Sequence, residues 1–524
     1  VEPPEAICNL TKAVQLINNA CQQGEKIAIL SDYDVDGITS MSLMWHCFHN
    51  LGFNFTPFFP NREIEGYGLT ERVVDRILST QKHFDYFIAC DCGTNSNEAV
   101  EKLKACGTEV IIIDHHQHTR ANLPDAIVIN PHINKHLHSI SAQELCSVGL
   151  VFKWVHAWLK LLKKENYPPA INLKMRPFLD LVALGTIADV VPLKHENRLW
   201  VFFGLNEIIH TKITGLQQLL IVSDCNLKFP LSVEDVSFKL APRINASGRL
   251  ETADMTFKML TTTDKSIGQQ LAHQLNSLNQ ERQNIEKQIV KEAEAKIKAD
   301  PHQSAYVLYN PLWHIGVVGI VAGRLTRKYN CPVFVLGDHE GKAKGSGRSI
   351  PEINLVEMFT EANALIDQWG GHPAAVGLTL NHQNITQLQQ FFRTYLNKKF
   401  PKSLPEATLS IAAVINLQQI TTQFINTLDQ LAPFGQGNEM PIFVIQNVKL
   451  NYPPEKFGRN GNHIRFKLGN YTVIGWNINQ EDFPVNASLD LAIKFSWSYW
   501  KNERIVQIIL VDWHLSGQKI YKKY

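Results

Sequence analysis

Three short apolar runs in the first 120 residues are each followed directly by an acidic or histidine-containing cluster. The segments are 27–37 (IAILSDYDVDG), 86–93 (YFIACDCG) and 110–116 (VIIIDHH). Continuous apolar runs of this length are typical of strands in a parallel sheet that is covered on both faces. Such sheets bind ligands at the carboxyl ends of their strands. We therefore expect the three clusters to meet at one edge of a parallel sheet.

The length and composition indicate a multidomain globular protein. A chain of 524 residues is too long for one core and predicts about three to four domains. Its net charge of +2 gives no broad basic field, so binding charge for a nucleic acid would have to be local. We see neither a membrane-spanning run nor a signal sequence, and we expect a cytoplasmic protein without membrane association.

The nine cysteines are scattered, with no Cys-x-x-Cys pair, which favours reduced thiols. Cys90 and Cys92 flank Asp91 and could suggest a zinc site. They lack a second thiol pair, and free cysteines usually pack as small buried hydrophobes. We therefore favour structural packing over zinc binding for both thiols.

Four regions follow one another along the chain. Residues 1–262 alternate strand-like and helix-like segments and then become helical, which predicts an α/β domain with a helical extension. The polar, proline-free stretch 263–300 predicts one long connecting helix. A smaller α/β domain is expected over 301–400, and short alternating strands predict an OB-like β-barrel over 401–524. A dimeric coiled coil remains the alternative for the long helix, but we favour packing within a monomer.

The acidic clusters predict a centre for hard divalent cations. Asp34 and Asp36 stand in one loop closed by Gly37, so both carboxylates could reach one ion. Carboxylates mixed with imidazole favour Mn²⁺ or Mg²⁺ over structural zinc, and the number of carboxylates suggests two ions bridged by Asp91. A buried helix at 178–185 would deliver Asp189 as a further ligand. A solvated turn is the alternative for any one cluster, but three clusters together would repel one another without a cation.

Two segments rich in small residues carry arginines suited to phosphate. Arg243 and Arg249 lie in a Gly/Ser/Asn segment that we expect to be a loop, and Arg348 follows Ser346 and Gly347 in a similar segment. A guanidinium offers two parallel donors to a phosphate. A plain surface turn is the alternative for each segment. His372 could hydrogen-bond or protonate a phosphate, or it could be structural. We expect His314 to begin a helix and to pack at its N-terminus.

The expected barrel contains aromatic and basic side chains in alternation. Phe495, Trp497 and Tyr499 could form a stacking platform for bases or a face of the barrel core. For the cations we favour nucleic-acid binding. The basic and aromatic residues considered are Lys456, Phe457, Arg459, His463, Arg465, Phe466, Lys467, Lys494, Lys501 and Arg504.

The motifs DYDVDG, CDCGTN, DHH and ADVVPL, in this order, resemble those of the DHH phosphoesterase superfamily. Within it, further segments resemble the RecJ family of single-strand-specific exonucleases. These are NREIEGYG at 61–68, APRINASGR at 241–249, HIGVVG at 314–319, GSGRS at 345–349, GGHP at 370–373 and PFGQGN at 433–438. The resemblance extends over nearly the whole chain.

The resemblance implies a DHH domain, a DHHA1 domain and an OB-like domain, and an enzyme that degrades single-stranded DNA from the 5′ end to 5′ mononucleotides. It implies two Mn²⁺ or Mg²⁺ ions and work in DNA repair and recombination, with single-strand-binding protein and a helicase as partners. The implied metal ligands are Asp32, Asp34, Asp36, Asp91, His115, His116 and Asp189, of which all but Asp32 are also catalytic, together with His372. Asp114 is expected to orient a ligand, although Asp32 and Asp114 could exchange these roles. The implied DNA contacts are Arg62, Arg243, Asn245, Ser247, Arg249, Ser346, Gly347 and Arg348.

Two other functions remain open. A DHH phosphodiesterase of short oligonucleotides or cyclic dinucleotides would share the metal motifs but would need neither the long helix nor the barrel. A noncatalytic single-strand-binding scaffold would bind DNA without hydrolysing it. For the leading function we expect the strand to thread between the two α/β domains.

Overall fold

The computed structural model describes residues 1–62, 64–80, 83–458, 461–478, 480, 483–484, 486–500 and 503–517, with the backbone alone for 498–500 and 503–504. The chain divides into two compact units, Val1–Ala407 and Thr408–Tyr524. Unit 1 contains two separate sheets and the long helix, and unit 2 contains a third sheet.

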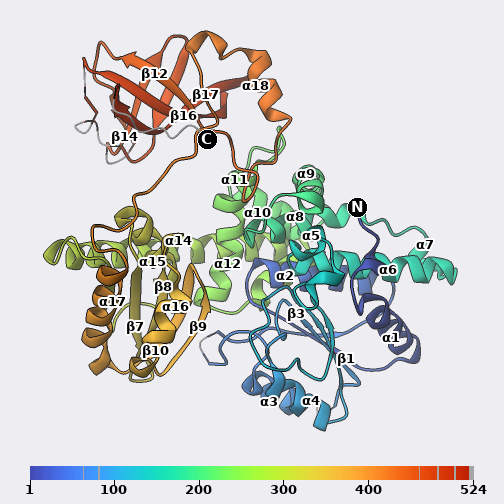
Figure 1. The fold of residues 1–524 in the computed structure, drawn as a ribbon. Helices are drawn as coiled ribbons and strands as arrows, with labels where there is room; N and C mark the ends of the chain where they lie inside the picture. The colour runs from blue at the N-terminus through green and yellow to red at the C-terminus, as the bar shows by residue number, and fades with distance from the viewer. Residues whose placement is uncertain are drawn as a thin grey trace. The chain divides into compact units, whose positions relative to one another are not determined.

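The first sheet has five parallel strands in the order β2-β1-β3-β4-β5. The strands are β1 (Ile27–Ser31), β2 (Thr56–Phe58), β3 (Tyr86–Cys90), β4 (Glu109–Ile113) and β5 (Ile127–Ile129). Ile29 faces one apolar core and Leu30 faces the other, so both faces are covered as the apolar runs predict. Helices lie on both sides of this sheet in Figure 1.

The order β1-β3-β4 places the three predicted strands next to one another. Ser31 pairs in register with Cys90, and Cys90 pairs with Ile113, so the three strands end at the same level. The acidic clusters follow at that level, which confirms the predicted parallel sheet and the meeting of the clusters at one edge.

Most of the first 264 residues outside this sheet are helical. The helices are α1 (Leu10–Gln23), α2 (Val35–Asn50), α3 (Glu71–Thr80), α4 (Asn97–Ala105), α5 (Ile140–Gln143), α6 (Ser147–Lys164), α7 (Pro168–Ile171), α8 (Leu179–Ala188), α9 (His195–Ile209), α10 (Thr214–Val222), α11 (Val233–Asp235), α12 (Ala241–Leu250) and α13 (Asp254–Thr261). The π-helical turn Val236–Leu240 joins α11 to α12. The buried helix predicted at 178–185 is α8, with Pro177 in the 3₁₀ turn that precedes it.

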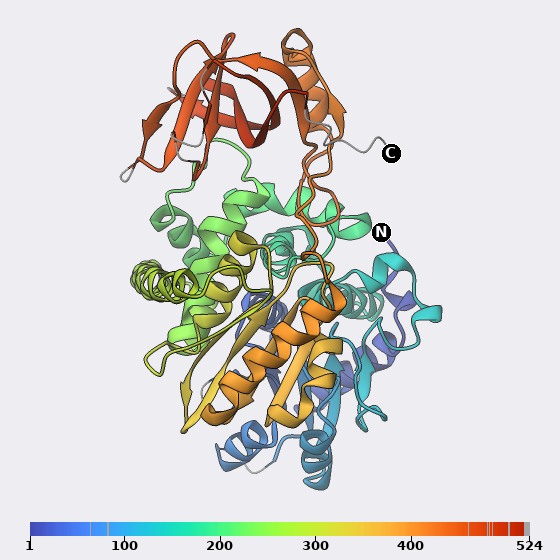
Figure 2. The same cartoon turned by 60° about the vertical axis from the view of Figure 1, so that its left-hand side comes forward.

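The long helix α14 (Lys265–Ala299) leads to the second sheet of unit 1. Its strands are β6 (Tyr306–Tyr309), β7 (Val333–His339), β8 (Lys342–Arg348), β9 (Gln368–His372) and β10 (Ala375–Leu380), in the order β6-β7-β8-β10-β9. Helices α15 (Val318–Tyr329), α16 (Leu355–Glu361) and α17 (Ile385–Lys399) accompany it, and Figure 2 shows this domain turned toward the viewer. Helix α14 packs on α10, α12 and α13 and also on α15.

Three local predictions in unit 1 were wrong. The segment 241–250 is helix α12 rather than a loop, because Pro242 suits a first helical turn and Ile244 and Ala246 are fully buried. The segment around Gly347 is a central strand, paired with β7 and β10, rather than a loop. His314 lies in the turn before α15, which begins only at Val318.

In its described residues, unit 2 is a mixed seven-stranded sheet with one α-helix, α18 (Thr422–Asp429). The strands are β11 (Ala413–Val414), β12 (Phe443–Lys449), β13 (Glu455–Phe457), β14 (His463–Leu468), β15 (Tyr471–Gly475), β16 (Ser488–Trp500) and β17 (Glu503–Leu515), in the order β11-β12-β16-β17-β15-β14-β13. Throughout the described ranges, no helix is long and apolar enough to span a membrane.

Candidate metal centre

The loop after β1 places three aspartates at the sheet edge. Asp34 caps α2 by accepting a hydrogen bond from the Gly37 N–H at 3.1 Å. A side chain at Gly37 would put its Cβ 2.3 Å from the Asp32 carbonyl oxygen, so only glycine allows the loop to fold this tightly. The sequence DYDVDG thereby holds Asp32 and Asp36 buried beside the sheet.

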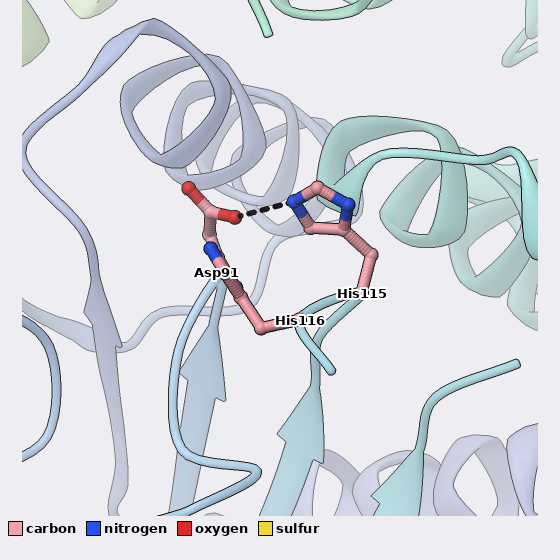
Figure 3. Close-up of side chains that lie close together, drawn as sticks. All are labelled: Asp91, His115 and His116. Carbon is pink, nitrogen blue, oxygen red and sulfur yellow. Dashed lines mark ion pairs between the residues drawn. The ribbon is translucent and has the colours of Figure 1, made fainter. Parts of the chain in front are cut away.

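Asp91 and His115 face each other from the ends of β3 and β4 (Figure 3). Asp91 has φ of 60°, a left-handed conformation that is uncommon for a residue other than glycine, and its N–H donates to the Ile113 carbonyl at 2.9 Å. Strained backbone of this kind is found preferentially at functional sites. The strain here turns the Asp91 side chain toward the neighbouring strand end.

The His115 Nε2 atom lies among three carboxylates. It is 3.5 Å from Asp91 Oδ1, 3.6 Å from Asp189 Oδ2 and 3.8 Å from Asp36 Oδ2. Burial and the neighbouring His116 lower the pKa of His115 to about 3, so its imidazole is neutral at pH 7. A neutral imidazole nitrogen surrounded by carboxylate oxygens is suited to binding a divalent cation.

A second group of carboxylates lies beside the first. Atoms of Asp32, Asp34 and Asp91 are within 4.8 Å of one another, as are atoms of Asp91, His115 and His116 and atoms of Asp36, Cys146 and Asp189. Asp91 therefore stands where the two groups of carboxylates meet. We call the six residues Asp32, Asp34, Asp36, Asp91, His115 and Asp189 the metal centre.

The electrostatics of the metal centre fit a bound cation. Burial and neighbouring aspartates raise the pKa of Asp36 to about 6, the pKa of Asp189 to about 9, and the pKa of Asp91 well above its usual range. Three buried atoms, Asp32 Oδ1, His115 Nε2 and Asp189 Oδ2, have no hydrogen-bond partner among the described residues. Buried polar atoms normally have partners, so these orphaned atoms fit metal coordination.

Helix α6 supplies donors that the sequence analysis missed. Asp36 accepts hydrogen bonds from the Ser147 N–H at 2.7 Å and the Val148 N–H at 2.8 Å. The Ser147 hydroxyl also donates to Asp91 Oδ1 at 2.9 Å. The segment Cys146-Ser147-Val148-Gly149 has no signature that separates it from an ordinary helix start, and only the fold brings it to the aspartates.

His116 has both ring nitrogens occupied. Nδ1 is 2.7 Å from Asp114 Oδ1, and Nε2 is 2.8 Å from the Tyr67 hydroxyl. Burial opposes a charge on His116, but Asp114 outweighs it and raises the pKa of His116 to about 9. Asp114 therefore orients the His116 ring beside the metal centre, where His116 also belongs to a group of potential metal ligands with Asp91 and His115.

Three arginines gather near the metal centre. The Arg62 guanidinium lies 5.4 Å from the centroid of the Tyr33 ring, Arg249 donates to the Gly316 carbonyl at 3.2 Å, and Arg348 Nη1 donates to Ser346 Oγ at 2.6 Å. Burial lowers the pKa of Arg249 to about 10 and also lowers that of Arg348, and the charge of Arg62 lowers both further. Within the described ranges, none of the three forms an ion pair with a carboxylate. This arginine cluster is suited to an anionic ligand.

The other predicted DNA contacts are placed differently. Arg243 donates to Asn276 Oδ1 and to the Lys239 carbonyl, at a distance from the arginine cluster along α12. Asn245 is half-buried, and Ser247 is fully buried with its hydroxyl paired to Thr256, so Ser247 packs inside the protein. Gly347 lies against the Phe334 ring.

His372 is exposed at the end of β9 and close enough for its charge to lower the pKa of His115.

Several alternatives from the sequence are resolved by burial. Cys90 and Cys92 are buried free thiols, and neither belongs to a group of potential metal ligands in the described part of the chain. Phe495 is 5% exposed in the core of unit 2, and Trp497 Nε1 donates to Asp429, which favours the core assignment for both rings. Arg459 and Lys501 lie outside the described residues, as do the side chains of Tyr499 and Arg504.

Comparison with known proteins identifies three matching domains. The DHH family N-terminal domain matches residues 26–186, the DHHA1 domain matches 302–398, and the RecJ OB domain matches 411–512. The last match identifies unit 2 as the predicted OB domain.

Similar proteins of known name cover nearly the whole chain. The single-stranded-DNA-specific exonuclease RecJ of Bacillus subtilis is 33% identical over 99% of this chain, which spans 65% of that relative's length. RecJ of Thermus thermophilus is 30% identical over 98% of this chain and 72% of the relative. The crystal structure of RecJ in complex with Mn²⁺ from Thermus thermophilus matches with a TM-score of 0.81 and 28% identity, covering 97% of this chain and 72% of that one. A structure of the same protein with Mg²⁺ matches with a TM-score of 0.75, 27% identity and coverage of 97% and 70%. The chain therefore belongs to the RecJ family.

Proposed function

We propose that this protein is a metal-dependent exonuclease that hydrolyses single-stranded DNA from the 5′ end and releases 5′ mononucleotides. The observation that carries the proposal is the meeting of orphaned carboxylate and imidazole atoms with an arginine cluster that has no acidic partner among the described residues. A cation site beside an anion site suits a phosphodiester substrate. The names of the relatives support single-stranded DNA as that substrate.

The proposed cofactor is a pair of Mn²⁺ or Mg²⁺ ions. Asp36, Asp91, His115 and Asp189 would hold one ion, and Asp32, Asp34 and Asp91 would hold the other, with Asp91 shared. Bound there, such ions lower the pKa of a water molecule and offset charge on the phosphoryl oxygens. The donor set of oxygens and one imidazole supports these hard cations. So do the two related structures, one of which is a complex with Mn²⁺ and the other a complex with Mg²⁺.

The remaining site residues would bind and orient the phosphates. Protonated His116, held by Asp114 and Tyr67, can donate a hydrogen bond to a phosphoryl oxygen. Arg348 with Ser346, and Arg62 beside them, would hold the 5′ end through charge-assisted hydrogen bonds. Arg249 would bind the phosphate backbone of the DNA next to the 5′ end. His372, at the end of β9 in the second sheet of unit 1, could hydrogen-bond to a phosphate or protonate it.

The proposed domain roles follow the predicted boundaries. Residues 1–262 would carry the metal centre, 263–300 the connecting helix, 301–400 the contacts to the 5′ end, and 401–524 the binding of the incoming strand. The proposal includes a monomer acting in the cytoplasm in DNA repair and recombination. Single-strand-binding protein and a helicase would supply its substrate.

The dependence of hydrolysis on strand length tests this function. We expect the rate at limiting substrate to rise with length, because a longer strand can also contact unit 2. A phosphodiesterase of short oligonucleotides would show no such rise. If the protein is a noncatalytic scaffold, the parent and the Asp91→Ala variant should bind long strands equally well, and neither should hydrolyse them.

A further inference from the structure

Helices α14 and α15 form a basic groove outside the metal centre. They pack side by side in unit 1 (Figure 1), and the groove between them has a volume of about 500 Å³. The described residues that line it include five cations and one carboxylate: Lys287, Lys291, Lys298, Arg324, Lys328 and Glu294. The chain as a whole has a net charge of only +2. The groove therefore concentrates positive charge in one place.

Most of this charge has no acidic partner among the described residues. Glu294 accepts from Lys328 at 2.7 Å, and Glu286 accepts from Arg324 at 3.4 Å while it also pairs with Arg282. In the described part of the chain, no carboxylate pairs with the three exposed lysines Lys287, Lys291 and Lys298. Lys287 and Lys291 are one helical turn apart, where like charges destabilise a helix by a few tenths of a kcal/mol. A surface that is merely solvated would be more stable if positive and negative side chains alternated. The three lysines therefore favour the binding of an anion in the groove.

The arrangement of the lysines suits a polymer with regularly spaced charges. Positions 287, 291 and 298 lie along one face of α14, over eleven residues or about 16 Å. This length matches about five nucleotides of a strand with one charge per about 3.4 Å. Lysine ammonium groups bind phosphates as point charges, and contacts to phosphates carry no sequence information.

Helix α15 joins this groove to the arginine cluster. At its first turn, a Cβ on Gly319 would lie 3.3 Å from Ser346 Oγ and 3.5 Å from Arg348 Nη2, so the helix packs directly against these residues. Arg324 and Lys328 stand further along the same helix and face α14. The groove therefore begins within one helix length of the group that would hold the 5′ end.

We propose that the α14/α15 groove binds the phosphodiester backbone of the single-stranded DNA substrate at nucleotides outside the metal centre. The choice of DNA rests on the proposed function, which it deepens. The groove would add a sequence-independent and salt-sensitive contact, and long strands would use it while short ones would not.

The test compares two triple variants that remove the same charge. One is Lys287→Gln/Lys291→Gln/Lys298→Gln, and the control removes the exposed Lys12, Lys164 and Lys174, which lie far along the chain from the groove. Binding of labelled oligothymidylates of about 6 and about 40 nucleotides is measured in EDTA at several salt concentrations. The slope of log K against log salt is negative, and each phosphate contact contributes about −0.7 to it. We therefore expect the groove variant to reduce the magnitude of this slope for the long strand by about 2. The control variant should keep the parent's slope, and so should Lys287→Arg/Lys291→Arg/Lys298→Arg.

The outcomes separate this proposal from the proposed function. An unchanged slope for the long strand in the groove variant would overturn the groove proposal. So would loss of affinity for a polyglutamate peptide with unchanged DNA binding, because the occupant would then be an acidic protein segment. A parent that binds the long strand but never hydrolyses it would overturn the proposed function while the slope comparison still decides the groove. A parent that binds no single-stranded DNA would overturn both.

Discussion

Asp91 Oδ1 and His115 Nε2 lie 3.5 Å apart across the ends of two adjacent parallel strands. Asp91 is buried among like charges and His115 is buried and neutral, so neither group satisfies the other without a cation. Their separation is too long for a good hydrogen bond and leaves room for an ion between them.

Replacement of Asp91 by Asn is expected to have opposite effects on activity and on metal-free stability. Loss of the shared carboxylate should reduce metal-dependent hydrolysis by more than about 10³-fold. In EDTA the same change removes repulsion with Asp36 and should raise the melting temperature. Activity assays measure the first effect and calorimetry with and without Mn²⁺ measures the second, with the exposed Asp125→Asn as the matched control. A lower melting temperature in EDTA would argue against buried repulsion.

The stability of the metal-free protein should fall as the pH rises from about 6.5 to about 9. The pKa of Asp189 is raised to about 9, as is that of His116, so the folded state holds more protons than the unfolded state in this window. His115, whose pKa is lowered to about 3, has the opposite effect only below about 6.5. Denaturant unfolding in EDTA across this range measures the trend. Asp189→Asn should flatten it, and saturating Mn²⁺ should stabilise the protein more at pH 8 than at pH 6.5.

Asp114→Asn is expected to lower the pKa of His116 toward its usual value. The carboxylate is the partner of His116 Nδ1 at 2.7 Å and the main cause of its raised pKa. An NMR titration of the His116 ring protons follows the change directly. Because orienting partners of this kind typically contribute 10- to 100-fold, we expect a fall in hydrolysis of about that size. An unchanged His116 titration would contradict the assigned pairing.

Arg348→Gln should weaken binding of strands that carry a 5′ phosphate. Removing one charge-assisted contact is expected to raise the dissociation constant by about 10- to 100-fold. The loss should be smaller for a strand with a 5′ hydroxyl, which has one phosphate fewer. Competition binding in EDTA with the two strands measures the difference. Equal losses for both strands would mean that Arg348 does not hold the terminal phosphate.

Gly248→Ala should impair hydrolysis although Gly248 is not a ligand. A Cβ there would lie 2.5 Å from the Tyr33 carbonyl oxygen. Because this is too close, either α12 or the loop that carries Asp32 and Asp34 would have to move away. Small displacements of reacting groups can reduce rates by about 100-fold. A Cβ on Gly323 of α15 would lie in ordinary contact with Arg348 Cγ at 3.7 Å, so Gly323→Ala serves as the control. Steady-state rates and Mn²⁺ affinity together show whether the centre has shifted.

The sequence predicted the parallel sheet and the convergence of the clusters because local patterns determine both. Apolar runs identify buried strands, and parallel strands bring their carboxyl ends to one edge. The helical state of Arg243 and Arg249 could not be predicted from a segment rich in Gly, Ser and Asn, since packing of Ile244 overrides these local preferences. Ser147 and Tyr67 were missed as members of the site for a related reason. Each belongs to a different segment, and only tertiary structure brings them to Asp91 and His116.

The proposed function requires that the metal centre cuts single-stranded DNA from its 5′ end. The most direct measurement follows a 5′-labelled single strand and its 3′-labelled counterpart after Mn²⁺ is added to metal-free protein. We predict that labelled mononucleotide appears first from the 5′-labelled strand, that a blunt duplex is spared, and that Asp91→Asn releases none. Label released first from the 3′ end, or no mononucleotide at all from the parent protein, would contradict the proposed function.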